Sequence, residues 1–239
     1  MSTSAPTAAW VHTGLLVLPL YAALVGYGAR AAEPDQVSNP EDWAVFVSTT
    51  AYFVEHLLGN VVGGALAIFG AFALGAYLAG SRGSAFALWG MTLAISGHVL
   101  FTVPGVVSTF VTPAIGHAYL AGNQAALTIE FSPVLMAVFG LALVLALVGN
   151  LLLAAAMWRS DRLPRWPGLL WAAGTVIFYL FGAVLGLVTT GASLPTQPVG
   201  AAILVIAGVA IAWRARRQPV AGLPVRSEAA RLVGQGSRS

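Results

Sequence analysis

The sequence predicts an all-α protein: a polytopic membrane helix bundle with six transmembrane helices and both termini in the cytoplasm. Three observations lead to this prediction, namely the apolar composition, six long apolar stretches and the uneven placement of arginine. Hydrophobic residues make up 58% of the 239 residues and charged residues only 8%, whereas soluble domains carry about 25% charged residues. The lipid bilayer is therefore the expected surrounding of most of the chain, and the cell membrane is its expected location.

The six predicted spans follow from the length that a helix needs to cross a bilayer. Roughly 20 consecutive, mostly apolar residues are required. The third span contains Pro104, which is expected to kink that helix or end it early, because proline lacks the N–H that a helix uses. The sixth is the shortest. The spans are 10–29, 53–79, 85–110, 130–158, 166–189 and 198–213, and together they form a transmembrane domain over residues 1–213.

Arginine placement predicts the orientation, since arginine near span ends prefers the cytoplasmic side. With both termini inside, ten arginines fall in cytoplasmic segments and only Arg30 falls outside. The first external loop carries four carboxylates, which agrees with this orientation. The tail 214–239 is polar and rich in arginine, so we expect a disordered cytoplasmic extension. The cytoplasmic arginines are Arg82, Arg159, Arg162, Arg165, Arg214, Arg216, Arg217, Arg226, Arg231 and Arg238, and the loop carboxylates are Glu33, Asp35, Glu41 and Asp42.

The composition also excludes several chemistries. The chain has no lysine, which excludes a retinal Schiff base, a pyridoxal phosphate enzyme and a lysine nucleophile. It has no cysteine, which excludes disulfide chemistry, thiolate-bound iron–sulfur clusters and thiolate zinc sites. The pI near 9.7 does not indicate a nucleic-acid partner, because the arginines lie beside apolar spans and in the tail rather than in one patch.

Candidate functional residues are the ionisable groups within or beside the spans, because such groups are costly in a membrane. Imidazoles with a carboxylate would suit zinc, copper or non-haem iron. A metal ion or haem b is therefore the candidate cofactor, although no catalytic residue can be named. The predicted metal set is His56, His98, His117, Glu55 and Glu130, all but His98 toward the external side, with His56 and His98 as the candidate cofactor ligands.

Depth distinguishes the two central histidines. Counted from the cytoplasmic ends of their spans, His56 lies about 35 Å up and His98 about 21 Å up. This offset of about 14 Å argues against a haem held between the two imidazoles. Tyr52, His56 and Asn60 recur at a spacing of four residues and so share one helix face, while Glu55 points elsewhere.

The connection 104–127 is predicted to be irregular or interfacial, because it contains two prolines, three glycines and an Asn-Gln pair. Irregular backbone at membrane depth requires protein or water to cover it. This connection is therefore the expected wall or lid of an outward-facing polar pocket.

Three functions remain open from the sequence. The first is a membrane protein that holds a histidine-ligated metal or haem for redox chemistry. The second is a proton-linked carrier of a small molecule, in which the same residues form the substrate site. The third is a structural accessory subunit, whose polar residues would be scattered and mutually satisfied. The sequence does not determine the substrate or the oligomeric state.

Overall fold

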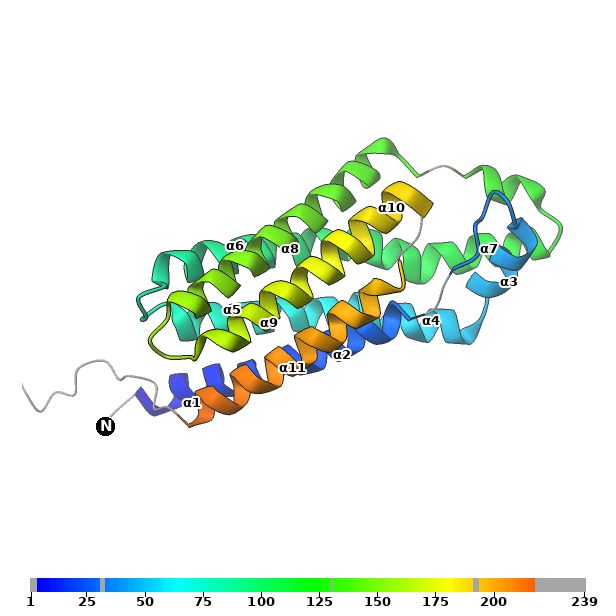
Figure 1. The fold of residues 1–239 in the computed structure, drawn as a ribbon. Helices are drawn as coiled ribbons and strands as arrows, with labels where there is room; N and C mark the ends of the chain where they lie inside the picture. Colours follow the sequence, from blue (N-terminus) through cyan, green and yellow to red (C-terminus); the bar gives the residue numbers. More distant parts are fainter. Residues whose placement is uncertain (1–3, 31–32, 130, 191–193, 218–239) are drawn as a thin grey trace, which may run out of the picture.

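The computed structural model describes residues 4–30, 33–129, 131–190 and 194–217, and all regular structure in these ranges is helical. Six of the helices are long and apolar enough to cross a membrane, which confirms the predicted number of spans. The first span begins and the last span ends on the same side of the bundle (Figure 1). The spans are Ala9–Gly28, Thr50–Leu78, Ser84–Leu120, Pro133–Arg159, Arg165–Thr189 and Thr196–Arg216.

The first span is broken by a proline. It consists of α1 (Ser4–Leu15) and α2 (Val17–Gly28), which meet at Leu16. Pro19 has no N–H to donate to the carbonyl of Leu15, and its ring crowds that carbonyl. The α-helix is therefore interrupted at Leu16 and resumes at Val17, two residues before Pro19.

The third span is longer than predicted, and the irregular connection over 104–127 is wrong for most of its length. Helix α6 (Ser84–Val106) runs through Pro104, continues as the π-helix η2 (Val107–Val111) and ends as α7 (Thr112–Leu120). The wide turn of η2 lies between Pro104 and Pro113, and a π-turn can accommodate a missing N–H without ending the helix. Only the short 3₁₀-helix η3 (Gln124–Thr128) and its neighbours are irregular.

The remaining spans differ from the predictions mainly at their ends. The second comprises α4 (Thr50–His56), the π-helix η1 (Leu57–Val62) and α5 (Gly63–Leu78). The fourth is α8 (Pro133–Arg159). The fifth comprises α9 (Arg165–Thr175), the π-helix η4 (Val176–Val184) and α10 (Leu185–Thr190). The sixth, α11 (Thr196–Arg216), takes in Arg214 and Arg216, so the helix extends into the predicted tail, whose residues 218–239 lie outside the described ranges.

A small helical cap sits at one end of the bundle. This end is called the outer end or cap end below, and the opposite, arginine-rich end is called the inner end. The third span has 37 residues, or about 55 Å of helix, against a hydrocarbon core of about 30 Å. Its last part, α7, packs on α3 (Pro40–Val47) next to α4 (Figure 1). Trp43, Val47 and Tyr52 are buried there against Ile115, in a cluster separate from the main core.

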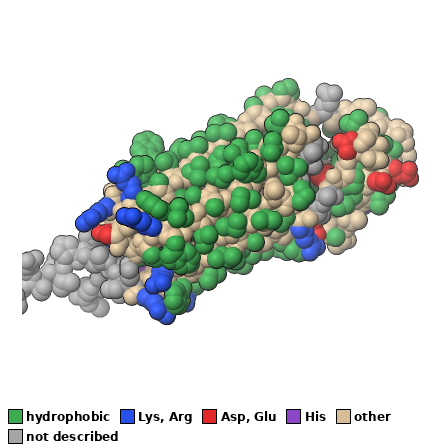
Figure 2. All heavy atoms as spheres, in the orientation of Figure 1, with side chains coloured by type: hydrophobic (Ala, Val, Ile, Leu, Met, Phe, Trp, Pro, Cys, Tyr) green, Lys and Arg blue, Asp and Glu red, His purple; other side chains and the backbone are tan. Residues whose placement is uncertain are grey.

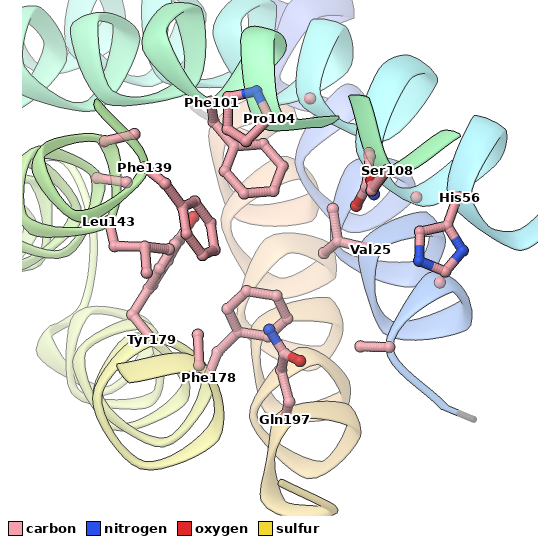
Figure 3. Close-up of a pocket in the computed structure, with 18 of the residues that line it drawn as sticks. Val25, His56, Phe101, Pro104, Ser108, Phe139, Leu143, Phe178, Tyr179 and Gln197 are labelled. Atoms are coloured by element: carbon pink, nitrogen blue, oxygen red, sulfur yellow. The ribbon is translucent and has the colours of Figure 1, made fainter. Parts of the chain in front are cut away.

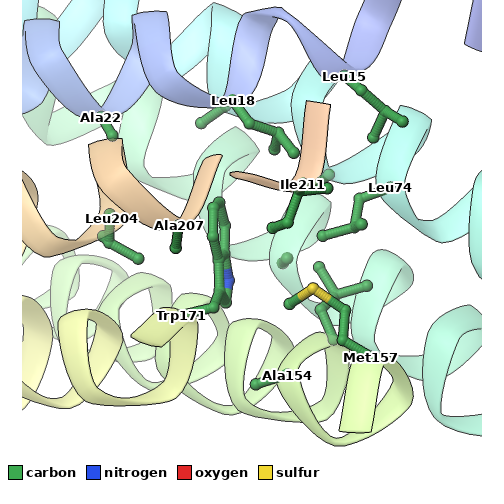
Figure 4. Packing of buried hydrophobic residues seen from close by; sticks show 14 of the residues in the cluster. Leu15, Leu18, Ala22, Leu74, Ala154, Met157, Trp171, Leu204, Ala207 and Ile211 are labelled. Carbon is green, nitrogen blue, oxygen red and sulfur yellow. The ribbon is translucent and has the colours of Figure 1, made fainter. Parts of the chain in front are cut away.

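The main core fills the other half of the bundle. Trp171 of α9 is 1% exposed and lies among leucine, methionine and isoleucine side chains from α1, α2, α5, α8 and α11 (Figure 4). Its indole N–H donates to Asn150 Oδ1 at 3.1 Å, and Asn150 Nδ2 donates to the carbonyl of Ala146 at 2.9 Å. This buried polar pair is therefore satisfied inside the apolar core, as a membrane interior requires.

Charge separates the two ends of the bundle (Figure 2). Seven of the eight described arginines cluster at the end that holds the chain termini, whereas Glu33, Asp35, Glu41 and Asp42 lie at the cap end. Arg162 donates to the carbonyls of Tyr77 and Gly80 and so caps α5. Arg217 lies 3.8 Å from the ring centre of Trp213, as in the aromatic and basic belts of membrane interfaces. The seven arginines are Arg82, Arg159, Arg162, Arg165, Arg214, Arg216 and Arg217.

Candidate binding cavity

A cavity of about 390 Å³ lies in the outer half of the bundle, and all six spans contribute to its wall. Its deepest residues include His98 of α6 and Ala146 of α8. Both lie about 20 Å from the arginine-rich ends of their helices at 1.5 Å per residue. Its outermost residues, Ala29, Glu33 and Phe131, lie at the cap end. The cavity therefore runs from the middle of the bundle to the cap end. The core around Trp171 fills the half of the bundle nearer the arginine-rich end.

The cavity has an aromatic side and a polar side (Figure 3). Phe101, Phe139, Phe178 and Tyr179 gather on one side, where Phe101 and Phe139 pack with ring centres 5.8 Å apart. His56 and Ser108 face the space on the other side, the side chain of Gln197 lies between the two beside Phe178, and Asn60 and Glu33 also line the cavity. This division suits a molecule with an apolar body and a polar group.

Each of the three π-helical segments lines this cavity. Segment η1 contributes Asn60, η2 contributes Ser108, and η4 contributes Phe178 and Tyr179. A π-turn widens the helix and is uncommon, and it is often found at functional sites. Three spans thus depart from regular helix at the level of one cavity.

The polar side presents hydrogen-bond acceptors. His56 Nδ1 lies 3.0 Å from the carbonyl oxygen of Tyr52; a carbonyl can only accept, so Nδ1 carries the proton and Nε2 of the neutral ring is an acceptor. The His56 ring also stacks on Tyr52, with centres 3.8 Å apart. Asn60 Nδ2 donates to Ser108 Oγ, whose own hydrogen is donated to the carbonyl of Gly105. Asn60 therefore keeps its Oδ1 as an acceptor.

Two buried side chains on the cavity wall have unused polar atoms. Gln197 is 8% exposed, and its Oε1 has no hydrogen-bond partner among the described residues. His98 is 7% exposed, and within the described ranges its ring contacts Tyr21 edge-on but forms no side-chain hydrogen bond. Buried polar atoms without partners are costly. Both side chains therefore have capacity for a ligand or water.

Two carboxylates differ in their place and partners near the outer end of the cavity: Glu33 lines it and Glu55 does not. Glu33 Oε1 accepts the indole N–H of Trp43 at 2.7 Å. Burial raises the pKa of Glu33 above its usual value, and the hydrogen bond from Trp43 opposes that rise. Glu55 instead forms an ion pair with Arg30, at 2.6 Å from Nη2 and 3.0 Å from Nε. Arg30, which lies away from the other described arginines, is thus balanced by a buried carboxylate.

The structure brings together only part of the predicted site. His56 and His98 line one cavity, at the different depths that the sequence indicated. Glu55 is occupied by Arg30, His117 is exposed on α7 and does not line the cavity, and Glu130 lies outside the described residues. Within the described ranges, no three His, Asp or Glu side chains are grouped as metal ligands. The metal set therefore stays a prediction without structural support.

Sequence reasoning missed several residues of the cavity. Glu33 was assigned to an external loop as a topology marker, and Gln197 fell one residue outside the predicted sixth span. The phenylalanines were taken as ordinary apolar residues of their spans. A sequence signal existed only for Gln197, since glutamine at the start of an apolar helix is a polar group at membrane depth.

Comparisons of the chain with protein-family models, curated proteins and solved structures find no match. The fold is an all-helical bundle compatible with a multi-pass membrane protein, and the function has to be argued from the cavity.

Proposed function

We propose that the protein is a small membrane carrier whose substrate site is the cavity, and that its substrate is a small amphipathic organic molecule. The observation that carries this proposal is the convergence of three π-helical segments on one cavity. Its volume, about 390 Å³, lies in the range of small-molecule sites, about 300–1,000 Å³. An accessory subunit with mutually satisfied polar residues would not require such a space.

The shape of the bundle favours a carrier over a fixed cofactor site. The cavity reaches the cap end but is closed toward the arginine-rich end by the packed core. An outward-facing site at mid-membrane with a closed inner half is one of the two states of an alternating-access carrier. The π-turns supply a means of change, because a π-turn can shift along a helix or return to α-helix.

A pocket-filling variant tests this proposal. Gly64 lines the cavity, and a Cβ at Gly64 would meet no atom within 4 Å. Gly64→Leu should therefore fill the cavity without disturbing the fold. Gly140 of α8 is equally open but does not line the cavity, so Gly140→Leu is the matched control.

The measurements are ligand-induced thermal shifts in nanodiscs and uptake into proteoliposomes. Small aromatic amines, alcohols and acids serve as probes. The wild type and Gly140→Leu should show a stabilising ligand and its uptake, and Gly64→Leu should lose both. Binding unaffected by Gly64→Leu would contradict this site. A stoichiometric metal, or a haem absorption near 400 nm lost in His98→Ala, would favour the cofactor function instead.

A further inference from the structure

We infer that the ligand is an organic cation, with an ammonium group held on the polar side of the cavity and an apolar, ring-sized body on the aromatic side. This inference rests on the proposed small-molecule site and specifies its ligand. It follows from the hydrogen-bonding roles of the polar side chains and from the charge of the cavity wall.

Three of the unused polar atoms on the cavity wall are acceptors. They come from the second and sixth spans: His56 Nε2, Asn60 Oδ1 and Gln197 Oε1. A buried acceptor is satisfied only by a donor. A primary ammonium group carries three donors and no acceptor, so it matches such a set, whereas a carboxylate or phosphate would leave every one of these atoms unsatisfied.

The charge of the cavity wall also favours a cationic ligand. No arginine lines the cavity, and Glu33 is the one carboxylate among its described lining residues. The arginine nearest in sequence, Arg30, is already bound to Glu55, so Glu33 has no cation partner in the described part of the chain. A partly buried carboxylate without a counter-charge is unfavourable, and a bound cation would relieve that cost.

The charged residues around the cavity entrance also favour a cation. Asp35, Glu41 and Asp42 lie with Glu33 at the cap end, so the local potential concentrates cations at the entrance (Figure 2). On the aromatic side, Phe178 and Tyr179 offer apolar contact to the body of the ligand. Together, these features favour a ligand that carries a positively charged group on an apolar body.

Three probes of nearly equal size test the inference: 3-phenylpropylamine, 3-phenylpropan-1-ol and 3-phenylpropanoate. Binding to the full-length protein in nanodiscs of neutral lipid is measured by calorimetry at pH 7.5. We expect the amine to bind at least about tenfold more tightly than the alcohol and the acid to bind most weakly. Glu33→Gln should remove the preference for the amine while leaving the affinity for the alcohol within about twofold.

The control variant is Glu41→Gln, because Glu41 is an exposed carboxylate of the same cap that does not line the cavity. It should keep the tenfold preference. Equal or tighter binding of the alcohol would overturn the cationic ligand, while loss of that binding in Gly64→Leu would show that the site itself stands. Failure of all three probes to bind, or binding unchanged in Gly64→Leu, would overturn the site and the ligand class together.

Discussion

The inner and outer halves of the bundle use the same apolar residue types but are built differently. In the inner half, α6 and α8 are regular α-helices whose backbones nearly touch: a Cβ at Gly90 would lie 2.8 Å from the amide nitrogen of Leu153. In the outer half, three spans contain π-turns and surround a cavity. Helix regularity thus accompanies dry packing, and irregularity accompanies the space for a ligand.

The two halves also differ in how they place charge. The inner end carries seven described arginines, five of which lie over aromatic rings. The outer end carries carboxylates, of which Glu55 is paired and Glu33 is not. If the inner end faces the cytoplasm, this asymmetry is what the preference of arginine for that side requires.

The largest effect we expect concerns this orientation. A reporter domain fused after Arg217 should report a cytoplasmic location, and so should one inserted into the loop at Arg162; an insertion near Asp35 should report the outside. The comparison uses paired reporters, one active only in the cytoplasm and one only outside. A cytoplasmic result at Asp35 would invert the assignment of the two ends.

The second effect concerns the tight contact in the inner half. Gly149→Leu should destabilise the protein by about 3 kcal/mol or abolish its folding, because overpacking a backbone contact cannot be relieved by side-chain movement. The added Cβ would collide with the backbone of Ala94 on α6. Gly140→Leu on the same helix, where a Cβ meets no atom within 4 Å, should change stability by less than about 0.5 kcal/mol. Thermal unfolding in detergent gives both values, and equal losses would contradict the packing difference.

A smaller effect is expected at the outer ion pair. Arg30→Gln should destabilise the protein, because it leaves the carboxylate of Glu55, 7% exposed, without its counter-charge. The double variant Arg30→Gln/Glu55→Gln should recover most of that loss, since two neutral amides can still hydrogen-bond. Chemical unfolding of the wild type, both single variants and the double variant forms a cycle. Additive losses would show that the pair is not coupled.

The spans could be predicted because apolar length is a property of the local sequence. Counting apolar residues located all six helices, and arginine placement separated the two ends. The same reasoning failed at Pro104 and Pro113, where two prolines suggested an irregular connection. The chain stays helical there because a π-turn absorbs the disruption.

The cavity was harder to predict because its members come from all six spans. Spacing along one helix related Tyr52, His56 and Asn60, but it could not show that Glu33 and Gln197 face the same space. Nor could it show that Arg30 neutralises Glu55, a contact between residues 25 positions apart. Ionisable residues could be singled out from the sequence, whereas their partners depended on helix packing.

The smallest effect we expect concerns Glu33 and Asp35, two carboxylates at the cap end. Their contributions to stability should change with pH in opposite directions. Burial raises the pKa of Glu33 above 4.5, so its contribution to stability is full at low pH and is lost as the pH rises through the raised value. Hydrogen bonds from the backbone and side chain of Ser38 lower the pKa of Asp35 below 3.8. Its contribution is therefore present at neutral pH and lost as the pH falls through the lowered value.

Glu33→Gln, which keeps the oxygen that accepts from Trp43, should raise the melting temperature by about 1–3 °C at pH 7.5 and leave it unchanged near pH 4. Asp35→Asn should do the opposite and lower it slightly at pH 7.5, with the difference shrinking in more acidic buffer. The measurement is thermal unfolding of the ligand-free protein across this pH range. A loss of stability in Glu33→Gln at neutral pH would mean that the carboxylate already has a counter-charge in the ligand-free protein. A bound cation would then not be needed to neutralise Glu33.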